Sequence, residues 1–156
     1  MVVVSVQFPG QSELRASVES SSGSEQCGRL NETQLYSQTK HTSLDEYPWL
    51  GRIKYFKNNY EPHYQCLAVL FKAQWALFPA HCVPTTKELE MYSVLFGDWN
   101  ATDDVKTGDC NNLGECAPPP QEYLIEEIAV HPNYNLRQYA HDIALVKMQT
   151  STLRND

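Results

Sequence analysis

Long apolar runs, basic residues and sustained helical periodicity are what this sequence has little of. No apolar run approaches the roughly 18 residues that a membrane-spanning helix needs, so we expect no membrane span. The 156 residues carry 12 Lys and Arg against 19 Asp and Glu, which gives a formal net charge of −7. That acidic balance argues against a nucleic acid or an anionic membrane as a non-specific partner. There is no internal repeat and no convincing long helix.

Short apolar segments separated by turn residues dominate what is present. Such segments, alternating apolar with polar positions or apolar throughout, predict an all-β barrel or sandwich over residues 47–156. Before this domain we expect a Ser-rich, disordered linker over residues 1–26 and an exposed connector over residues 27–46. The six expected strands are 50–56, 64–71, 75–78, 91–96, 123–130 and 143–148.

Cysteine content indicates an oxidising compartment. The chain has five cysteines, and an odd number leaves at least one without an internal partner. Glycosylation sequons at Asn31 and Asn100 agree with a secreted, extracellular protein. The first ten residues are apolar, but they show neither a basic n-region nor a clear cleavage site, so no signal peptide is visible. We therefore expect the true N-terminus to lie upstream of Met1.

A histidine and an aspartate stand at the ends of two apolar segments. The run 75–78 leads into Pro79, Ala80 and His81, and Asp142 opens the run 143–146. An imidazole and a carboxylate at strand ends can supply the base and the orienting group of a nucleophilic-catalysis site. The simpler alternatives are a surface or core histidine at position 81 and a strand-entry cap at Asp142. The nucleophile of such a site is missing from the pattern.

The order of several short motifs is the order seen in trypsin- and chymotrypsin-like serine proteases. These motifs are Tyr47–Trp49, Cys66, Ala80–Cys82, His131–Tyr134 and Asp142–Val146. Over residues 27–148 the chain therefore resembles that family. More narrowly, it is similar to the arthropod clip-domain serine proteases and their non-catalytic homologues. The narrower likeness rests on Leu44–Trp49, Gly97–Trp99 and the segment Asp109–Pro120.

The resemblance implies a fold and two catalytic roles. The fold would be one antiparallel, six-stranded Greek-key barrel, the first of the two barrels in this family. His81 matches the general base that takes a proton from a serine hydroxyl and returns it to the leaving amine. Asp142 matches the carboxylate that orients this histidine. Its neighbour His141 would be a solvated loop residue.

The resemblance also implies how the cysteines pair. Cys66 and Cys82 have the spacing of the disulfide that encloses the family's catalytic histidine. Cys110 and Cys116 would close a small surface loop. Cys27 matches a cysteine whose partner lies beyond residue 148, which would explain the odd count.

Several positions depart from the family pattern. The Gly-Asp-Ser-Gly context of the nucleophile is absent, as are the substrate pocket and the second barrel, so the chain alone is predicted to be inactive. The expected activation site falls on residues 35–39, which lack a basic residue followed by an apolar-Gly-Gly pattern. Leu67-Ala68 replaces a Gly-Gly pair, and Pro79 replaces a small residue. We expect these changes to disturb the packing near His81.

Two metal-binding interpretations compete with these roles. Four residues offer zinc-type ligands, but they lack a paired Cys-x2-Cys spacing: His63, Cys66, His81 and Cys82. Four acidic residues offer calcium-type oxygens: Asp98, Asp103, Asp104 and Asp109. A solvated acidic loop explains the second set more simply. We expect no metal and no other cofactor.

Two functional hypotheses follow. In the first, the chain is part of a trypsin-like serine endopeptidase, a hydrolase that performs proteolysis with His81 and Asp142. In the second, it belongs to a non-catalytic clip-domain homologue, a pseudoprotease that acts as a binding cofactor in an extracellular cascade such as melanisation or innate immune signalling. Both imply secretion and protein partners, either substrates or cascade proteases, together with a second barrel of the same domain. An unrelated secreted β-domain is a third, weaker hypothesis.

Overall fold

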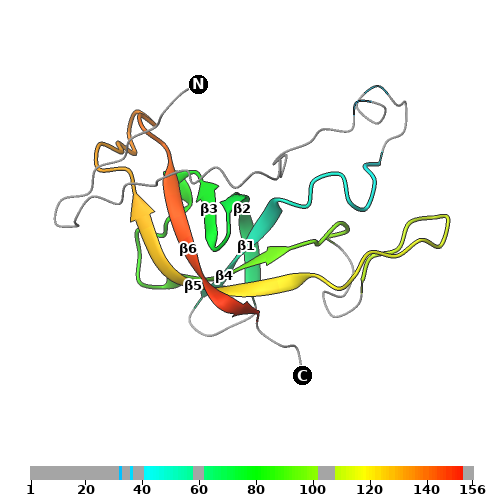
Figure 1. The fold of residues 1–156 in the computed structure, drawn as a ribbon. Helices are drawn as coiled ribbons and strands as arrows, with labels where there is room; N and C mark the ends of the chain where they lie inside the picture. Colours follow the sequence, from blue (N-terminus) through cyan, green and yellow to red (C-terminus); the bar gives the residue numbers. More distant parts are fainter. Residues whose placement is uncertain (1–31, 33–35, 37–40, 58–61, 102–107, 153–156) are drawn as a thin grey trace, which may run out of the picture.

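The computed structural model describes Glu32, Tyr36 and residues 41–57, 62–101 and 108–152. Its strands form one closed antiparallel barrel in the order β1-β2-β3-β6-β5-β4 (Figure 1), which confirms the predicted all-β, six-stranded barrel. The elements are β1 Leu50–Lys57, β2 Pro62–Lys72, β3 Trp75–Phe78, the 3-10 turn η1 Ala80–Cys82, β4 Leu89–Phe96, β5 Gln121–Val130 and β6 Ala144–Thr152. No helix in the described part of the chain has the length and apolarity to cross a membrane.

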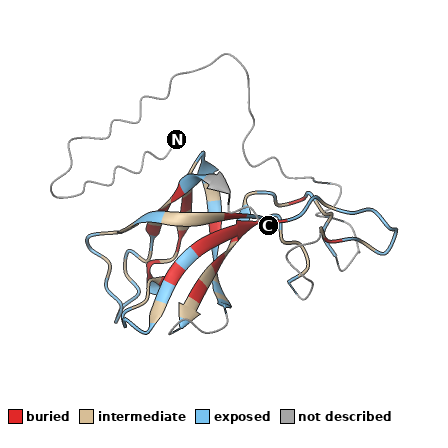
Figure 2. Ribbon diagram, turned by 90° about the horizontal axis from the view of Figure 1, so that it is seen from below, coloured by how far each residue is buried: buried red, intermediate tan, exposed pale blue. Residues whose placement is uncertain are grey.

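Alternating burial along the strands builds the core of the barrel. In β1, Ile53 and Tyr55 are buried, and in β6, Ala144, Val146 and Met148 are buried at every second position. Because successive side chains of a strand point to opposite faces, this alternation directs one face of each strand inward. Figure 2 shows the resulting bands of buried residues along the strands. The sequence pattern that predicted the strands is therefore the pattern that fills the barrel.

Strand β1 closes the barrel because it pairs with β2 on one side and with β4 on the other. Its register shifts on both sides around Lys54, and such irregularities bend a strand. Near the start of the strand, a Cβ on Gly51 would lie 2.7 Å from side-chain atoms of both Phe96 and Val94. Glycine at this position thus allows β1 and β4 to approach closely.

The connection between β4 and β5 extends away from the barrel, as its yellow-green trace in Figure 1 shows. It is anchored by Asp109, which is buried and whose Oδ2 accepts the backbone N–H groups of Trp99 and Asn100, both at 2.7 Å. The indole of Trp99 donates to the Thr42 hydroxyl at 3.0 Å. The end of the connector that precedes the barrel is therefore attached to this loop. The predicted linker over residues 1–26 lies outside the described residues.

Candidate active site

His81 is presented by the turn that follows β3. Phe78 is buried, Pro79 then precedes η1 with φ −68° and ψ 135°, and the Pro79 carbonyl accepts the N–H of Cys82 at 3.1 Å. Ala80 and Cys82 are buried on either side of His81, whose own side chain is 45% exposed. A short turn with two buried anchors thus directs one imidazole outward.

Asp142 reaches His81 from the loop that joins β5 to β6. Asp142 Oδ1 accepts the backbone N–H of His81 at 2.8 Å, and Asp142 Oδ2 lies 2.7 Å from His81 Nδ1. The two residues that the sequence placed 61 positions apart are therefore in direct contact through two atoms each. The hydrogen bond from the His81 side chain lowers the pKa of Asp142 below its ordinary value, against an opposing effect of burial.

This contact determines which nitrogen of His81 is available for chemistry. An ionised carboxylate can only accept hydrogen bonds, so the proton shared with Asp142 belongs to Nδ1 of the neutral ring. Nε2 then carries a lone pair. An imidazole held in that tautomer by a carboxylate can take a proton from a hydroxyl that approaches Nε2.

A disulfide and a tyrosine hold the histidine turn against the barrel. The structure joins Cys66 of β2 to Cys82 of η1, with a Cα–Cα distance of 6.2 Å. The hydroxyl of Tyr55, which is buried in β1, donates to the Cys82 carbonyl at 2.9 Å. Burial raises the pKa of Tyr55 to about 12, so its hydroxyl remains a donor across the physiological range. Three strands thus contribute to the position of His81.

The surroundings of His81 are open. An open cavity of about 430 Å³ borders His81 and the disulfide, and its walls include Gln65, Leu89 and Leu136. On another side, the exposed ring of Tyr139 meets the His81 ring edge to face, with 6.0 Å between ring centroids. A chain segment or side chain of a bound partner could therefore reach the imidazole from solvent.

The structure corrects the expectation that Pro79 and Leu67-Ala68 disturb this region. The φ angle of Pro79 is the one that the proline ring prefers, and Ala68 is fully buried in the core. Leu67 points outward and is 56% exposed. Neither change prevents the contacts between His81 and Asp142. His141 is exposed as expected, but its ring also stacks on His131.

The metal-binding alternatives find little support among the described residues. Ligand atoms of Cys66, His81 and Cys82 lie within 4.8 Å of one another, but the two sulfurs are joined in the disulfide and offer no thiolates. In the acidic loop, Asp98 forms an ion pair with Arg52. Asp109 is occupied by backbone N–H groups. The remaining predicted ligands Asp103 and Asp104 lie outside the described residues, and His63 is not part of the cluster.

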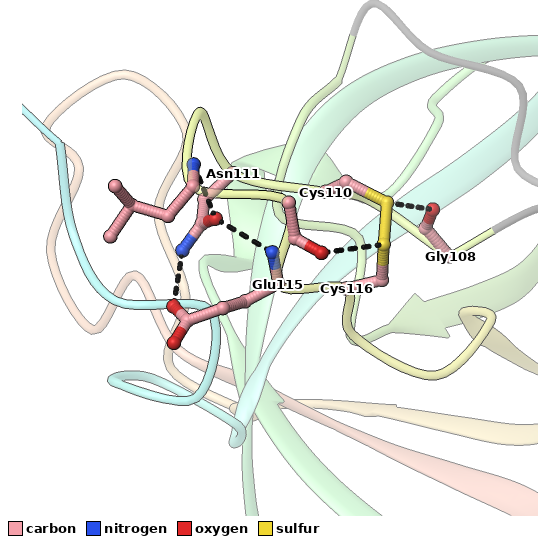
Figure 3. Close-up of a disulfide and its surroundings, with 7 residues drawn as sticks. Gly108, Cys110, Asn111, Glu115 and Cys116 are labelled. Carbon is pink, nitrogen blue, oxygen red and sulfur yellow. Dashed lines mark hydrogen bonds between the residues drawn. A yellow bond between two sulfur atoms is a disulfide. The ribbon is translucent and has the colours of Figure 1, made fainter.

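The second disulfide closes a small, ordered loop. Cys110 and Cys116 are bonded, and the side chain of Asn111 organises the residues between them (Figure 3). Asn111 Oδ1 accepts the N–H groups of Leu113 and Glu115, each at 3.0 Å, and its Nδ2 donates to Glu115 Oε2 at 2.7 Å. Of the other predicted sites, Asn100 is half-buried, whereas Asn31, Cys27 and most of the expected activation site lie outside the described residues.

Sequence reasoning missed three contributors to the site. The sequence patterns place Tyr55 in a strand without indicating its hydrogen bond, and they predict neither the ring contact of Tyr139 nor the turn η1. The inward alternation of β1 could have placed Tyr55 in the core, but nothing local indicates that its hydroxyl reaches Cys82. These contacts join segments that are distant in the sequence.

Comparison with known proteins identifies the family. The sequence model described as trypsin matches residues 36–156, which is most of the chain. The chain belongs to the trypsin family of serine proteases. Within this family, it is 32% identical to CLIP domain-containing serine protease B10 of Anopheles gambiae, over 74% of this chain and 33% of that protein. It is 31% identical to phenoloxidase-activating factor 3 of Holotrichia diomphalia, over 83% of this chain and 37% of that protein.

A solved structure agrees with this assignment. The crystal structure of the Drosophila Grass clip serine protease of the Toll pathway matches with a TM-score of 0.66 and 27% sequence identity. The match covers 79% of this chain and 34% of that chain. The barrel of this trypsin-family chain thus has the fold of part of a clip protease. The chain spans about a third of the length of the curated relatives that it matches.

Proposed function

We propose that this chain supplies the general base and its orienting carboxylate to a trypsin-like serine endopeptidase. The observation that carries the proposal is the double contact of Asp142 with the backbone N–H and Nδ1 of His81, at 2.8 and 2.7 Å. A surface histidine without a catalytic role would not require one carboxylate to bind both its backbone N–H and its ring nitrogen.

In the proposed mechanism, His81 Nε2 removes the proton from a serine hydroxyl as that hydroxyl attacks the scissile peptide carbonyl. Asp142 stabilises the imidazolium that forms and keeps its ring oriented. His81 then returns the proton to the leaving amine. The serine and the donors of the oxyanion hole come from sequence that this chain does not contain, so we expect the chain alone to hydrolyse no peptide.

We place the protein outside the cell, with protein substrates or cascade proteases as its partners. The two disulfides support an oxidising environment. The relatives include a phenoloxidase-activating factor, and the matched crystal structure is that of a protease of the Toll pathway. A role in an extracellular immune cascade follows by analogy with these proteins.

A non-catalytic homologue is the second candidate. The observation in its favour is the expected activation segment, residues 35–39, which lacks a basic residue followed by apolar-Gly-Gly. A trypsin-like activator could not cut it in the usual way. Such a protein would keep the barrel and bind a cascade protease without hydrolysing substrate.

Labelling with a fluorophosphonate probe tests the two candidates, because the probe reacts only with an activated serine. The experiment uses the full-length gene product after limited proteolysis. We expect labelling that is lost in His81→Ala and retained in the matched control His63→Ala, which removes an exposed histidine from β2. The downstream coding sequence provides an independent check. A Gly-Asp-Ser-Gly-Gly-Pro segment there supports the enzyme, whereas glycine in place of that serine, with no labelling, would refute it.

A further inference from the structure

The loop that carries Asp142 also contains a pair of stacked imidazoles. The rings of His131 and His141 stack face to face, with centroids 4.8 Å apart and planes 6° from parallel. His131 directly follows β5, and His141 directly precedes Asp142. His131 Nδ1 accepts a hydrogen bond from the backbone N–H of Asn133, with 3.1 Å between the two nitrogens. This bond fixes the orientation of the His131 ring.

The backbone around Asp142 is in a conformation that needs support. His141 has φ +55° and Tyr139 has φ +50°, and residues other than glycine seldom adopt such left-handed conformations. Histidine tolerates this region better than most residues, but tyrosine has no such preference. The turn that directs Asp142 toward His81 is therefore not one that its sequence adopts by itself.

Hydrogen bonds tie both stacked residues to the position after Asp142. The N–H of His131 donates to the Ile143 carbonyl at 3.1 Å, and the N–H of Ile143 donates to the His141 carbonyl at 2.8 Å. Asp142 thus lies between two residues, His141 and Ile143, that are each attached to His131. The stack is the side-chain part of this attachment.

We propose that the His131–His141 stack is a positioning element that holds Asp142 against His81. This inference rests on the His81–Asp142 pair that carries the proposed function, and it adds a role for two residues outside that pair. In this role His131 acts through the backbone of Asp142 and not by contact with the reacting atoms. A planar ring at position 131 is what the role requires, because the contact is made by ring faces.

The Nδ1 proton that His81 shares with Asp142 gives a direct measurement by proton NMR in the 156-residue chain. A proton held in that hydrogen bond exchanges slowly with water and gives a resonance far downfield, and it needs no nucleophile to be seen. In His131→Ala we expect its exchange with water to become about fivefold to tenfold faster, as loss of one aromatic pair implies. In His131→Phe, which keeps a planar ring but loses the acceptor for the Asn133 N–H, we expect a clearly smaller acceleration than in His131→Ala.

A second variant distinguishes the effect of the ring contact from the effect of the backbone conformation. Asparagine adopts left-handed conformations readily, so His141→Asn removes the ring and keeps the turn. We expect it to accelerate exchange as His131→Ala does, and it serves in place of His131→Ala should that variant fail to fold. The matched control is His63→Ala, which should leave the resonance unchanged.

The possible results distinguish this inference from the proposed function. A chain that shows the resonance, with unchanged exchange in both His131→Ala and His141→Asn, would overturn the stack's role and leave the pair intact. Fast exchange in His131→Phe equal to that in His131→Ala would overturn it too, because the ring face would then not matter. An unmodified chain without the resonance, together with an Asp142 carboxyl titration that is the same in His81→Ala, would overturn the pair itself, and the stack's role with it.

Discussion

Two loops of this barrel each hold a carboxylate against backbone N–H groups, and they use it differently. Asp109, in the β4–β5 connection, is buried and gives one oxygen to the N–H groups of Trp99 and Asn100. Asp142, in the β5–β6 connection, is only half-buried, and it gives one oxygen to the His81 N–H and the other to the His81 ring. The first carboxylate organises its own loop, whereas the second positions a side chain from another part of the barrel.

The two disulfides repeat this contrast. Cys110 and Cys116 are 6 positions apart and close a loop on itself, whereas Cys66 and Cys82 are 16 positions apart and attach β2 to the turn of His81. A carboxylate or a disulfide used locally makes a loop rigid. A carboxylate or a disulfide that joins distant segments can assemble a site, because it fixes the distance between elements that are far apart in the sequence.

The largest expected difference between the two loops is in stability. Asp109→Ala leaves the N–H groups of Trp99 and Asn100 without their acceptor, so we expect a loss of about 3 kcal/mol in the free energy of unfolding. Asp142→Ala should cost less, because its partners are more exposed and can bond to water. Chemical denaturation of both variants measures this. An equal or greater loss in Asp142→Ala would show that the comparison is wrong.

A smaller effect separates two tyrosines near the site. Tyr55→Phe removes the donor to the Cys82 carbonyl, and we expect a loss of about 1–2 kcal/mol. Tyr134→Phe should leave stability unchanged or slightly higher, because the Tyr134 hydroxyl is the one buried side-chain polar atom without a hydrogen-bond partner in the described part of the chain. Thermal unfolding of the two variants at neutral pH provides the measurement. Equal losses would contradict the assigned role of Tyr55.

Tyr55 also predicts how stability depends on alkaline pH. Its folded pKa of about 12 lies above the unfolded value of about 10, so the folded state binds the proton more tightly. Its contribution is complete below pH 10 and is lost as the pH rises toward 12. This part of the pH dependence should disappear in Tyr55→Phe.

The smallest effect concerns the stability that the His81–Asp142 pair contributes at acidic pH. The pKa of Asp142 is lowered chiefly by the His81 side chain, so the pair contributes stability above the unfolded pKa of about 4 and loses it as the pH falls through the folded value. His81→Ala should raise the pKa of Asp142 toward its ordinary value. NMR titration of the Asp142 carboxyl carbon in both proteins checks this. An unchanged titration would mean that the two side chains do not interact in solution.

Much of the fold was predictable because its signals are local. Alternating burial in β1 and β6 follows from the alternation of apolar residues, and β3 was expected at the residues where it lies. The other strands extend beyond the expected limits; β4 and β5 begin earlier than expected, because pairing with a neighbour starts before the predicted apolar pattern does. Local patterns could not show that Glu122 of β5 is buried against Lys54 and Ser93.

The sequence by itself determined that this chain has strands with an inward apolar face, cysteines suited to oxidation, and a histidine and an aspartate at strand ends. These properties depend on residue type and short-range order. Only the tertiary structure decided that Asp142 meets His81 through two atoms, that the Tyr55 hydroxyl donates to the Cys82 carbonyl, and that His131 stacks on His141. Each of these contacts joins segments that closure of the barrel or of its β5–β6 loop brings together, so no local pattern encodes the distance between them.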